Sequence, residues 1–224
     1  MNQNNVFYKS EGDQWFKRNE AVLLFRNQNY DWPIKLIRKH KIKPQKVLEI
    51  GAANGWRLAE IKKLYGRTRC VGVEPSAKAV WAGRRNFPQI KMLRGLSSDL
   101  PVKGTFDLVI VNYVLHWVDR ALLFKTFSEI DRVLADDVYL IVSDFYPSVA
   151  TSNLYHHIRG GKVRTYKQNY AEVFTMSVIY KELEKVIFDH STKQSKKISP
   201  SDETGFAVLL KKSLRNHYKT GKRK

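Results

Sequence analysis

The sequence predicts an α/β fold with a doubly wound, mostly parallel sheet. Two largely apolar runs, residues 47–50 and 106–112, have the composition of strands that are buried on both faces. A loop with two glycines follows the first run, and apolar residues at helical spacing follow the loop. Strands that alternate with helices in this way build parallel sheets with helices on both faces.

Two helices are expected ahead of the first strand. The first covers residues 14–26, with Asp13 as its N-cap and several apolar residues on one face. The second covers residues 32–39, because Asp31 can cap it and Pro33 suits its first turn.

The stretch 47–55, VLEIGAANG, passes from a strand into a loop in which Gly51 and Gly55 stand four positions apart. Residues 56–64 continue as a helix, with apolar residues three positions apart on one face. Glycine lets the backbone approach a ligand closely, and the free N–H groups of the helix start point into the loop. The pattern therefore predicts a nucleotide-cofactor loop at the carboxyl edge of the first strand.

The spacing within this loop indicates which cofactor it binds. A dinucleotide fingerprint has three glycines, G-x-G-x-x-G, whereas this loop reads E-x-G-x-x-x-G. A carboxylate at Glu49 suits a cofactor that carries an ammonium group and no phosphate. The next strand, residues 70–73, ends in Glu74, which is 23 residues after Gly51 and can accept both hydroxyls of a ribose.

These residues together resemble the class I S-adenosylmethionine (SAM)-dependent methyltransferases. The resemblance implies a Rossmann-like sheet of seven strands, mostly parallel with an antiparallel last strand. It also implies SAM as the cofactor and S-adenosyl-L-homocysteine (SAH) as the product. The alternative is a glycine loop that only turns a strand into a helix. The residues that the resemblance assigns to the cofactor are Trp15, Arg18, Asn19, Glu49, Gly51, Ala52, Asn54, Gly55, Glu74, Pro75, Ser98, Asn112, Tyr113 and Trp117.

The resemblance gives some of these residues a specific role. Arg18 and Asn19 would reach the SAM carboxylate, and Trp15 would cover the cofactor as a lid, unless this is an ordinary amphipathic helix. The loop 95–101 would line the adenine through Ser98. Asp99 would either bind the exocyclic amine or cap a turn.

The remaining core elements are expected in the order helix 76–86, strand 90–93, strand 106–112, helix 122–134, strand 139–143, and the closing antiparallel pair 183–189 and 205–210. Phe124 is expected on the apolar face of helix 122–134. Residues 135–137, Ala-Asp-Asp, form a turn where the family usually has Pro-Gly-Gly.

Residues 147–175 are the insertion that class I enzymes place between their fifth and sixth strands, and they show no firm secondary-structure pattern. No acidic residue occurs between Tyr146 and Ala171. Because the insertion overhangs the ligand crevice, its basic residues suggest an anionic small substrate, such as a phosphate- or nucleotide-linked one. The expected substrate-binding residues are His156, Arg159, Lys167 and Tyr170.

Composition predicts a soluble cytoplasmic protein. The chain has 224 residues, of which 43% are hydrophobic and 27% charged, and its single cysteine, Cys70, excludes an internal disulfide. The polar N-terminus has no apolar signal core, and no apolar run is long enough to cross a membrane. We expect lid helices over residues 1–46, a methyltransferase core over 47–211 and a basic tail over 212–224.

The net charge of +19 suggests an anionic partner, or simply a solvated basic surface. The basic run 35–46 enters the first strand from the edge opposite the ligand crevice, and the tail leaves at that same edge. These two clusters are therefore poor candidates for holding a small substrate. Nucleic acid is a possible partner but not the favoured one.

Methyl transfer depends mainly on alignment, and a hydroxyl acceptor also gains from a base within hydrogen-bond reach. His116, Asp144 and His157 are the expected catalytic residues, with His156 as the neighbour that competes with His157. His116 could instead pack beside Trp117 at a helix start. No Asp/Glu/His cluster has metal-ligand spacing, so no metal is expected. The N-methyltransferase signature Asn/Asp-Pro-Pro-aromatic is absent after Asn112.

Longer sequence segments such as EGDQWFKRN and FDLVIVNYVLHWVDR resemble those of short methyltransferases encoded among bacterial surface-polysaccharide and nucleotide-sugar genes. The sequence therefore favours O-methylation of an anionic glycan precursor or similar metabolite. The alternatives are an RNA or protein methyltransferase that uses its basic surface, and a SAM-binding partner subunit without catalysis. The oligomeric state is not predicted.

Overall fold

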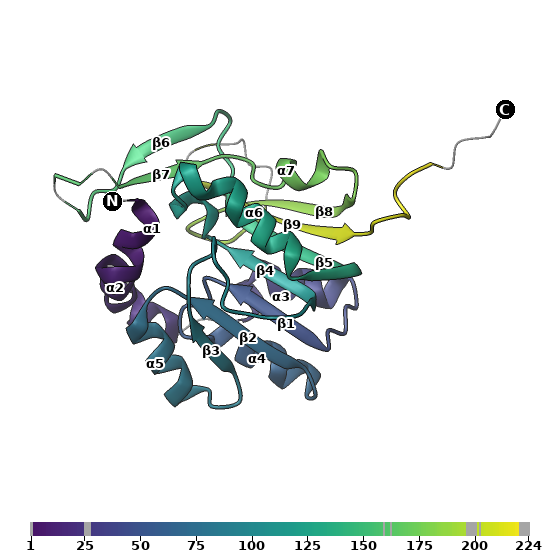
Figure 1. Ribbon diagram of the computed structural model, residues 1–224, viewed down its shortest axis with the longest axis horizontal. Coiled ribbons are helices and arrows are strands. Elements are labelled where there is room, and N and C mark those ends of the chain that lie inside the picture. The colour runs from purple at the N-terminus through teal and green to yellow at the C-terminus, as the bar shows by residue number, and fades with distance from the viewer. Residues whose placement is uncertain are drawn as a thin grey trace.

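The computed structural model describes residues 2–24, 28–158, 160–161, 163–195, 201 and 203–219. Its centre is a seven-stranded sheet with the order β3-β2-β1-β4-β5-β9-β8 (Figure 1). The strands of this sheet are β1 (Lys46–Ile50), β2 (Arg69–Glu74), β3 (Lys91–Arg94), β4 (Phe106–Asn112), β5 (Leu134–Phe145), β8 (Tyr180–Asp189) and β9 (Thr204–Lys212).

Strands β1 to β5 pair in parallel, while β9 runs antiparallel to both of its neighbours, β5 and β8. The predicted sheet, mostly parallel with an antiparallel last strand, is confirmed. The order reverses between β1 and β4, so a crevice opens at their carboxyl ends. The loop after β1 enters this crevice.

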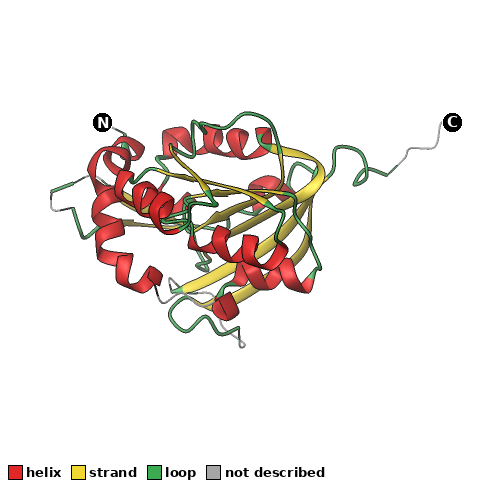
Figure 2. Ribbon diagram, turned by 90° about the horizontal axis from the view of Figure 1, so that it is seen from below, coloured by secondary structure: helices red, strands yellow, loops and turns green. Residues whose placement is uncertain are grey.

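Helices cover both faces of the sheet, as Figure 2 shows. In β4, Leu108 and Ile110 face the cluster that includes α3 and α4, and Val109 and Val111 face the cluster that includes α6. This alternation explains why the strand is apolar along its length. The helices are α1 (Gln3–Val6), a π-helix (Phe7–Glu11), α2 (Gly12–Leu24), α3 (Trp32–Lys39), α4 (Trp56–Tyr65), α5 (Ala77–Asn86), α6 (Leu123–Arg132) and α7 (Glu172–Thr175), with 3₁₀ turns at Gln28–Tyr30, Leu115–Trp117 and Arg120–Leu122.

The helix predictions before β1 are half correct. Helix α3 begins after Asp31, whose carboxylate accepts the N–H of Ile34 as predicted. The first helix was predicted to begin after Asp13, but the helical path already starts at Gln3. Asp13 instead accepts hydrogen bonds from the Ser76 hydroxyl (2.6 Å) and the Lys78 N–H (3.0 Å) at the start of α5. A capping carboxylate serves any helix start that comes close in space, and the sequence does not show which one does.

Two predictions around α6 and β5 are wrong. Phe124 is 76% exposed, because the buried face of α6 follows Leu123, Phe127 and Ile130. The predicted turn 135–137 lies inside β5, where Asp137 has a φ of 61° and forms a local irregularity. The tail holds this segment, since the Leu214 N–H donates to the Asp136 carboxylate at 2.8 Å.

The insertion has more structure than its sequence indicates. It contains a two-stranded antiparallel hairpin, β6 (Thr151–Leu154) and β7 (Arg164–Lys167), followed by α7. Figure 1 shows this hairpin beside the N-terminal helices.

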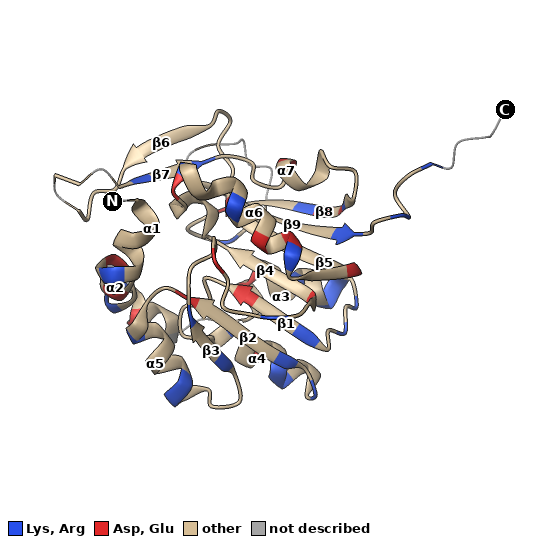
Figure 3. Cartoon of the chain, viewed as in Figure 1, with Lys and Arg blue, Asp and Glu red and all other residues tan. Residues whose placement is uncertain are grey.

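The basic residues at the end of the chain do not all belong to a tail. Lys212 ends β9, is buried and pairs with Asp131 at 2.8 Å, so it belongs to the sheet and not to a tail. Figure 3 shows Lys and Arg at the edge where the parallel strands begin and where the chain leaves the body. Within the described part of the chain, no helix is long and apolar enough to span a membrane.

Candidate active site

One cavity, called the inner cavity here, lies at the carboxyl ends of β1, β2 and β4 and has a volume of about 360 Å³. The predicted cofactor residues that line it are Trp15, Asn19, Glu49, Gly51, Ala52, Glu74, Pro75, Asn112, Tyr113 and Trp117. Segments that are far apart in the chain therefore meet where the sequence placed the cofactor.

The loop after β1 requires its first glycine. Gly51 has a φ of 72°, and a Cβ atom there would lie 2.2 Å from Cγ2 of Val114. Gly55 has a φ of 78° and forms the N-cap of α4, while the Asn54 side chain accepts the N–H of Trp56 at 3.3 Å. Neither Asn54 nor Gly55 lines the inner cavity, so these two predicted cofactor residues shape the loop and do not face its ligand.

Glu49 belongs to a buried charge network that the sequence analysis missed. The Arg57 guanidinium donates to Glu49 through Nη1 and to both oxygens of Asp31 through Nε and Nη2. Burial raises the pKa of Glu49 to about 7, although Arg57 opposes the shift. The second Glu49 oxygen, Oε2, has no protein partner among the described residues. An acceptor of this kind fits an ammonium group in the cavity.

The Glu74 carboxylate connects the loop after β1 to the loop after β2. Its Oε2 accepts the N–H of Ala53 at 2.9 Å and its Oε1 accepts the N–H of Ser76 at 3.0 Å. Burial raises the pKa of Glu74 to about 7, even though both hydrogen bonds favour the ionised form. The remaining lone pairs can accept hydroxyl groups, as expected for a ribose-binding acid.

The raised pKa of Glu74 predicts that SAH binds about tenfold more tightly at pH 8 than at pH 6, because ribose hydroxyls prefer an ionised acceptor. The folded pKa lies above the ordinary value, so the stability contribution of Glu74 has the opposite pH dependence. It is complete below about pH 4.5 and is lost as the pH rises through about 7. Calorimetric titration of SAH across this range tests the first statement. A Glu74→Gln variant with the same pH slope would contradict it.

The prediction that the loop 95–101 lines the adenine through Ser98 is only partly supported. Gly95, Leu96 and Ser97 line the inner cavity, whereas Ser98 does not. The Ser98 hydroxyl is buried and accepts a hydrogen bond from the Asn4 amide at 3.2 Å. It therefore connects the loop after β3 to the N-terminal helices.

Of the three cofactor residues predicted on α2, Trp15 and Asn19 line the inner cavity and Arg18 does not. The Arg18 guanidinium forms an ion pair with Glu11 and donates to the Tyr155 hydroxyl at 2.7 Å. The Tyr155 hydroxyl in turn donates to Glu11 at 2.7 Å. Arg18 thus joins α2 to the hairpin, and the prediction that it reaches the SAM carboxylate finds no support in its position.

A second cavity of about 600 Å³, called the outer cavity here, lies between α2 and the hairpin. It is lined by Trp15, Arg18, Asn19, His116, Trp117, Phe145, Asn153, Leu154, Tyr155, His156, His157, Thr165, Lys167 and Glu203. The residues that line both cavities are Trp15, Asn19, His116, Trp117 and Phe145. These five residues border both cavities, so the two cavities adjoin each other at this common wall.

His116 and Asp144 are close together, but only His116 faces the cavities. Nδ1 of His116 lies 2.8 Å from Oδ1 of Asp144. The two atoms are within ion-pair distance, but their alignment is not that of a hydrogen bond. The other carboxylate oxygen accepts the His116 backbone N–H at 3.3 Å. Asp144 is fully buried and lines neither cavity, so its predicted role as a catalytic residue becomes that of a residue that positions His116.

The predicted substrate residues do not lie together. His156 and Lys167 line the outer cavity, as does His157, the third predicted catalytic residue. Arg159 lies outside the described residues. Tyr170 is a core residue, which corrects the prediction: its side chain is fully buried, and its hydroxyl donates to the Tyr166 carbonyl at 2.5 Å.

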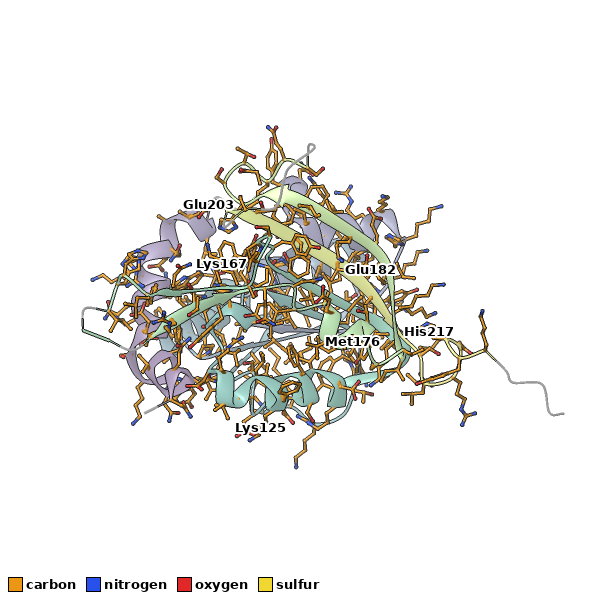
Figure 4. The ribbon with its side chains drawn as sticks, turned by 90° about the horizontal axis from the view of Figure 1, so that it is seen from above. Lys125, Lys167, Met176, Glu182, Glu203 and His217 are labelled. Atoms are coloured by element: carbon orange, nitrogen blue, oxygen red, sulfur yellow. The ribbon has the colours of Figure 1, made fainter. Side chains whose placement is uncertain are left out.

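Glu203 is an acidic wall residue of the outer cavity that the sequence analysis missed. Lys167 lies 3.8 Å from Glu203 and 4.4 Å from the centroid of the Phe145 ring. Figure 4 shows Lys167 and Glu203 near each other, at the end of the molecule opposite His217. Glu203 stands 36 positions after Lys167, on the far side of β8, so no local pattern connects the two.

The chain is similar to known methyltransferases in sequence and in fold. A family model described as a methyltransferase domain matches residues 47–137. A malonyl-[acyl-carrier protein] O-methyltransferase of Legionella pneumophila is 27% identical over 136 residues, which are 53% of this chain and 45% of that protein. An uncharacterized methyltransferase of Synechocystis is 35% identical over 91 residues, which are 40% of this chain and 42% of that protein. The chain therefore spans less than half the length of these curated relatives.

Solved structures extend the likeness to nearly the whole chain. The 1,6-didemethyltoxoflavin-N1-methyltransferase of Burkholderia thailandensis, with 1,6-didemethyltoxoflavin and SAH bound, matches with a TM-score of 0.70 and 14% identity over 93% of this chain and 88% of that one. The N-methyltransferase NodS of Bradyrhizobium japonicum, in complex with SAH, matches with a TM-score of 0.62 and 16% identity over 89% and 97%. At these identities the likeness shows the fold.

Proposed function

We propose that this class I SAM-dependent methyltransferase binds SAM in the inner cavity and methylates an oxygen atom of an anionic small molecule in the outer cavity. The observation that carries the proposal is the wall of five residues that the two cavities share. Methyl transfer is an in-line displacement, so donor and acceptor must meet at such a wall. His116 is one of these five residues.

The residues of the inner cavity fit SAM. The unpartnered Oε2 of Glu49 is suited to the ammonium group, and the Glu74 carboxylate is suited to the ribose hydroxyls. Gly51 lines the same cavity, and its lack of a side chain leaves room for Val114, which packs against the loop. Bound SAM supplies a methyl group on a positively charged sulfur.

The chain's own contribution to the reaction is alignment and removal of a proton. Trp15 and Trp117 border both cavities, so they would exclude water from the place where donor and acceptor meet. Asp144 faces Nδ1 of His116, which leaves Nε2 to accept the proton of a hydroxyl acceptor. An imidazole oriented in this way is suited to act as a general base near neutral pH.

The outer cavity supports an anionic acceptor. Lys167, Arg18 and three histidines lie in its wall, and each of the two cations is balanced by one acid, Glu203 or Glu11. Imidazoles and partly compensated cations suit an anion of low charge. Within this class, a surface-glycan or nucleotide-linked precursor is our first candidate.

A second candidate follows from the curated relatives named as malonyl-[acyl-carrier protein] O-methyltransferases. An acceptor of that type presents a carboxylate on a carrier protein. The hydroxyl and carboxylate candidates differ in their need for a base, since a carboxylate is already ionised at neutral pH.

The two candidates are separated by incubating the purified protein with methyl-labelled SAM and fractionated lysate. Label in the small-molecule fraction supports the first candidate, and its mass identifies the acceptor. Label on a small acidic protein, removed by mild base as a methyl ester would be, supports the second candidate. Label in RNA, or in proteins at large, would overturn both.

A further inference from the structure

Two residues of the loop between β8 and β9, His190 and Lys193, line the inner cavity and play no part in the proposed chemistry. They do not line the outer cavity. The aromatic side chains of Trp32, Tyr113 and Phe188 line the same cavity. The loop therefore adds two nitrogen-bearing side chains to an otherwise aromatic part of the wall.

The first part of this loop, residues 190–195, is held in place by hydrogen bonds. Oδ1 of Asp189 accepts the N–H groups of Ser191 and Thr192 at 2.9 and 2.7 Å. The Lys193 N–H donates to the Asp189 carbonyl at 2.9 Å, and the Lys193 carbonyl accepts the Trp32 indole N–H at 3.2 Å. Lys193 has a φ of 60°, a conformation that lysine adopts only where its surroundings enforce it.

The two side chains form a pair that donates hydrogen bonds. Nζ of Lys193 lies 3.2 Å from Nδ1 of His190. An ammonium group has three donors and no acceptor, so Nδ1 must accept this bond and the proton of the neutral ring then lies on Nε2. His116 has the opposite arrangement, because its Nδ1 faces a carboxylate. One histidine thus presents an acceptor at Nε2, and the other presents a donor.

The two histidines pack against the same aromatic ring. The Phe145 ring centroid is 5.0 Å from that of His116 and 4.9 Å from that of His190. The Tyr113 ring packs edge-on against His190 at 4.7 Å. A group bound at His190 is therefore close to the wall where transfer is proposed.

We propose that His190 and Lys193 form an oxyanion-binding site of the inner cavity, which takes a carboxylate group. An N–H donor and an ammonium group side by side, with aromatic walls, are the donors that such a group needs. The carboxylate belongs either to the methionyl end of the cofactor or to the acceptor. The identity of the bound molecule rests on the proposed function, whereas the chemistry of the site rests on the geometry of the loop.

The first test needs no ligand. Long-range ¹⁵N NMR of the histidine rings is expected to show His190 with its proton on Nε2 and His116 with its proton on Nδ1. Lys193→Met should remove the Nε2 preference of His190, whereas Lys181→Met, at an exposed position of the preceding strand β8, should leave it in place. A His190 ring that carries its proton on Nδ1 in the unmodified protein would overturn the proposal.

The second test measures binding by calorimetry and separates the two sources of the carboxylate. A cofactor carboxylate is indicated if Lys193→Met weakens SAH about ten- to hundredfold but leaves decarboxylated SAH unchanged. An acceptor carboxylate is indicated if SAH is unaffected and the SAH complex loses its affinity for benzoate but not for neutral benzamide. Lys193→Arg should retain most of the affinity in either case.

The proposal is overturned if Lys193→Met changes neither SAH nor benzoate binding, or if benzoate fails to bind the SAH complex while SAH is unaffected. Failure of SAH to bind the unmodified protein would instead contradict the proposed function. In that case the NMR measurement still decides whether the donor pair exists.

Discussion

Replacing Arg57 by Met is expected to lower the free energy of unfolding by about 3–5 kcal/mol. The Arg57 guanidinium is buried and pairs with the carboxylates of Asp31 and Glu49, which are buried as well. Its removal leaves two like charges in the interior without a counter-ion. Urea denaturation of the ligand-free protein measures the effect.

Arg132→Met is the matched control, because Arg132 pairs with Glu129 at the surface and its side chain is 43% exposed. It should cost less than about 1 kcal/mol. Arg57→Lys should rescue little, since one ammonium group cannot reproduce the three donors that serve Asp31 and Glu49. An Arg57→Met protein as stable as the Arg132 control would refute the role of the network.

Replacing His116 by Asn is expected to lower kcat by about 10²–10⁴-fold for a hydroxyl acceptor, with little change in the dissociation constant of SAH. The physical reason is the loss of the proton acceptor at the wall between the cavities. Steady-state kinetics with the acceptor identified by labelling, together with calorimetry of SAH, provides the measurement. His217→Asn, at a partly exposed position that lines neither cavity, is the control.

Asp144→Asn distinguishes the base from its positioning residue. It should lower kcat less than His116→Asn and shift the pH profile, because the ring orientation would no longer be enforced by a carboxylate. If His116→Asn changes kcat by less than threefold, alignment alone accounts for the rate. A carboxylate acceptor would then be favoured, since it needs no base.

Much of the fold could be predicted because it is encoded locally. The turn from β1 through Gly51 into α4 depends on residues that are close together in the chain. The alternation of apolar strands and amphipathic helices is equally local. For the same reason Glu49 and Glu74, which lie near the carboxyl ends of adjacent strands, could be assigned to one crevice from the sequence.

The predictions that were wrong concern residues whose role depends on a distant partner. Asp13 has the character of a cap for its own helix, yet it serves α5. Tyr170 has the polarity of a surface residue in a basic insertion, yet it completes the core beside α6. In both cases the side chain is compatible with two environments, and the tertiary packing determines which of them it occupies.

The sequence by itself determined the sheet, the cofactor loop and the two acids at the strand ends, because strand, turn and helix signals act over a few residues. The tertiary structure alone decided that Arg57 neutralises Glu49 and Asp31, and that the loop with His190 and Lys193 meets Trp32, 161 residues away from Lys193. Such contacts form only when the fold brings the segments together and removes water between them. Burial then determines which charges must pair and which donors remain for a ligand.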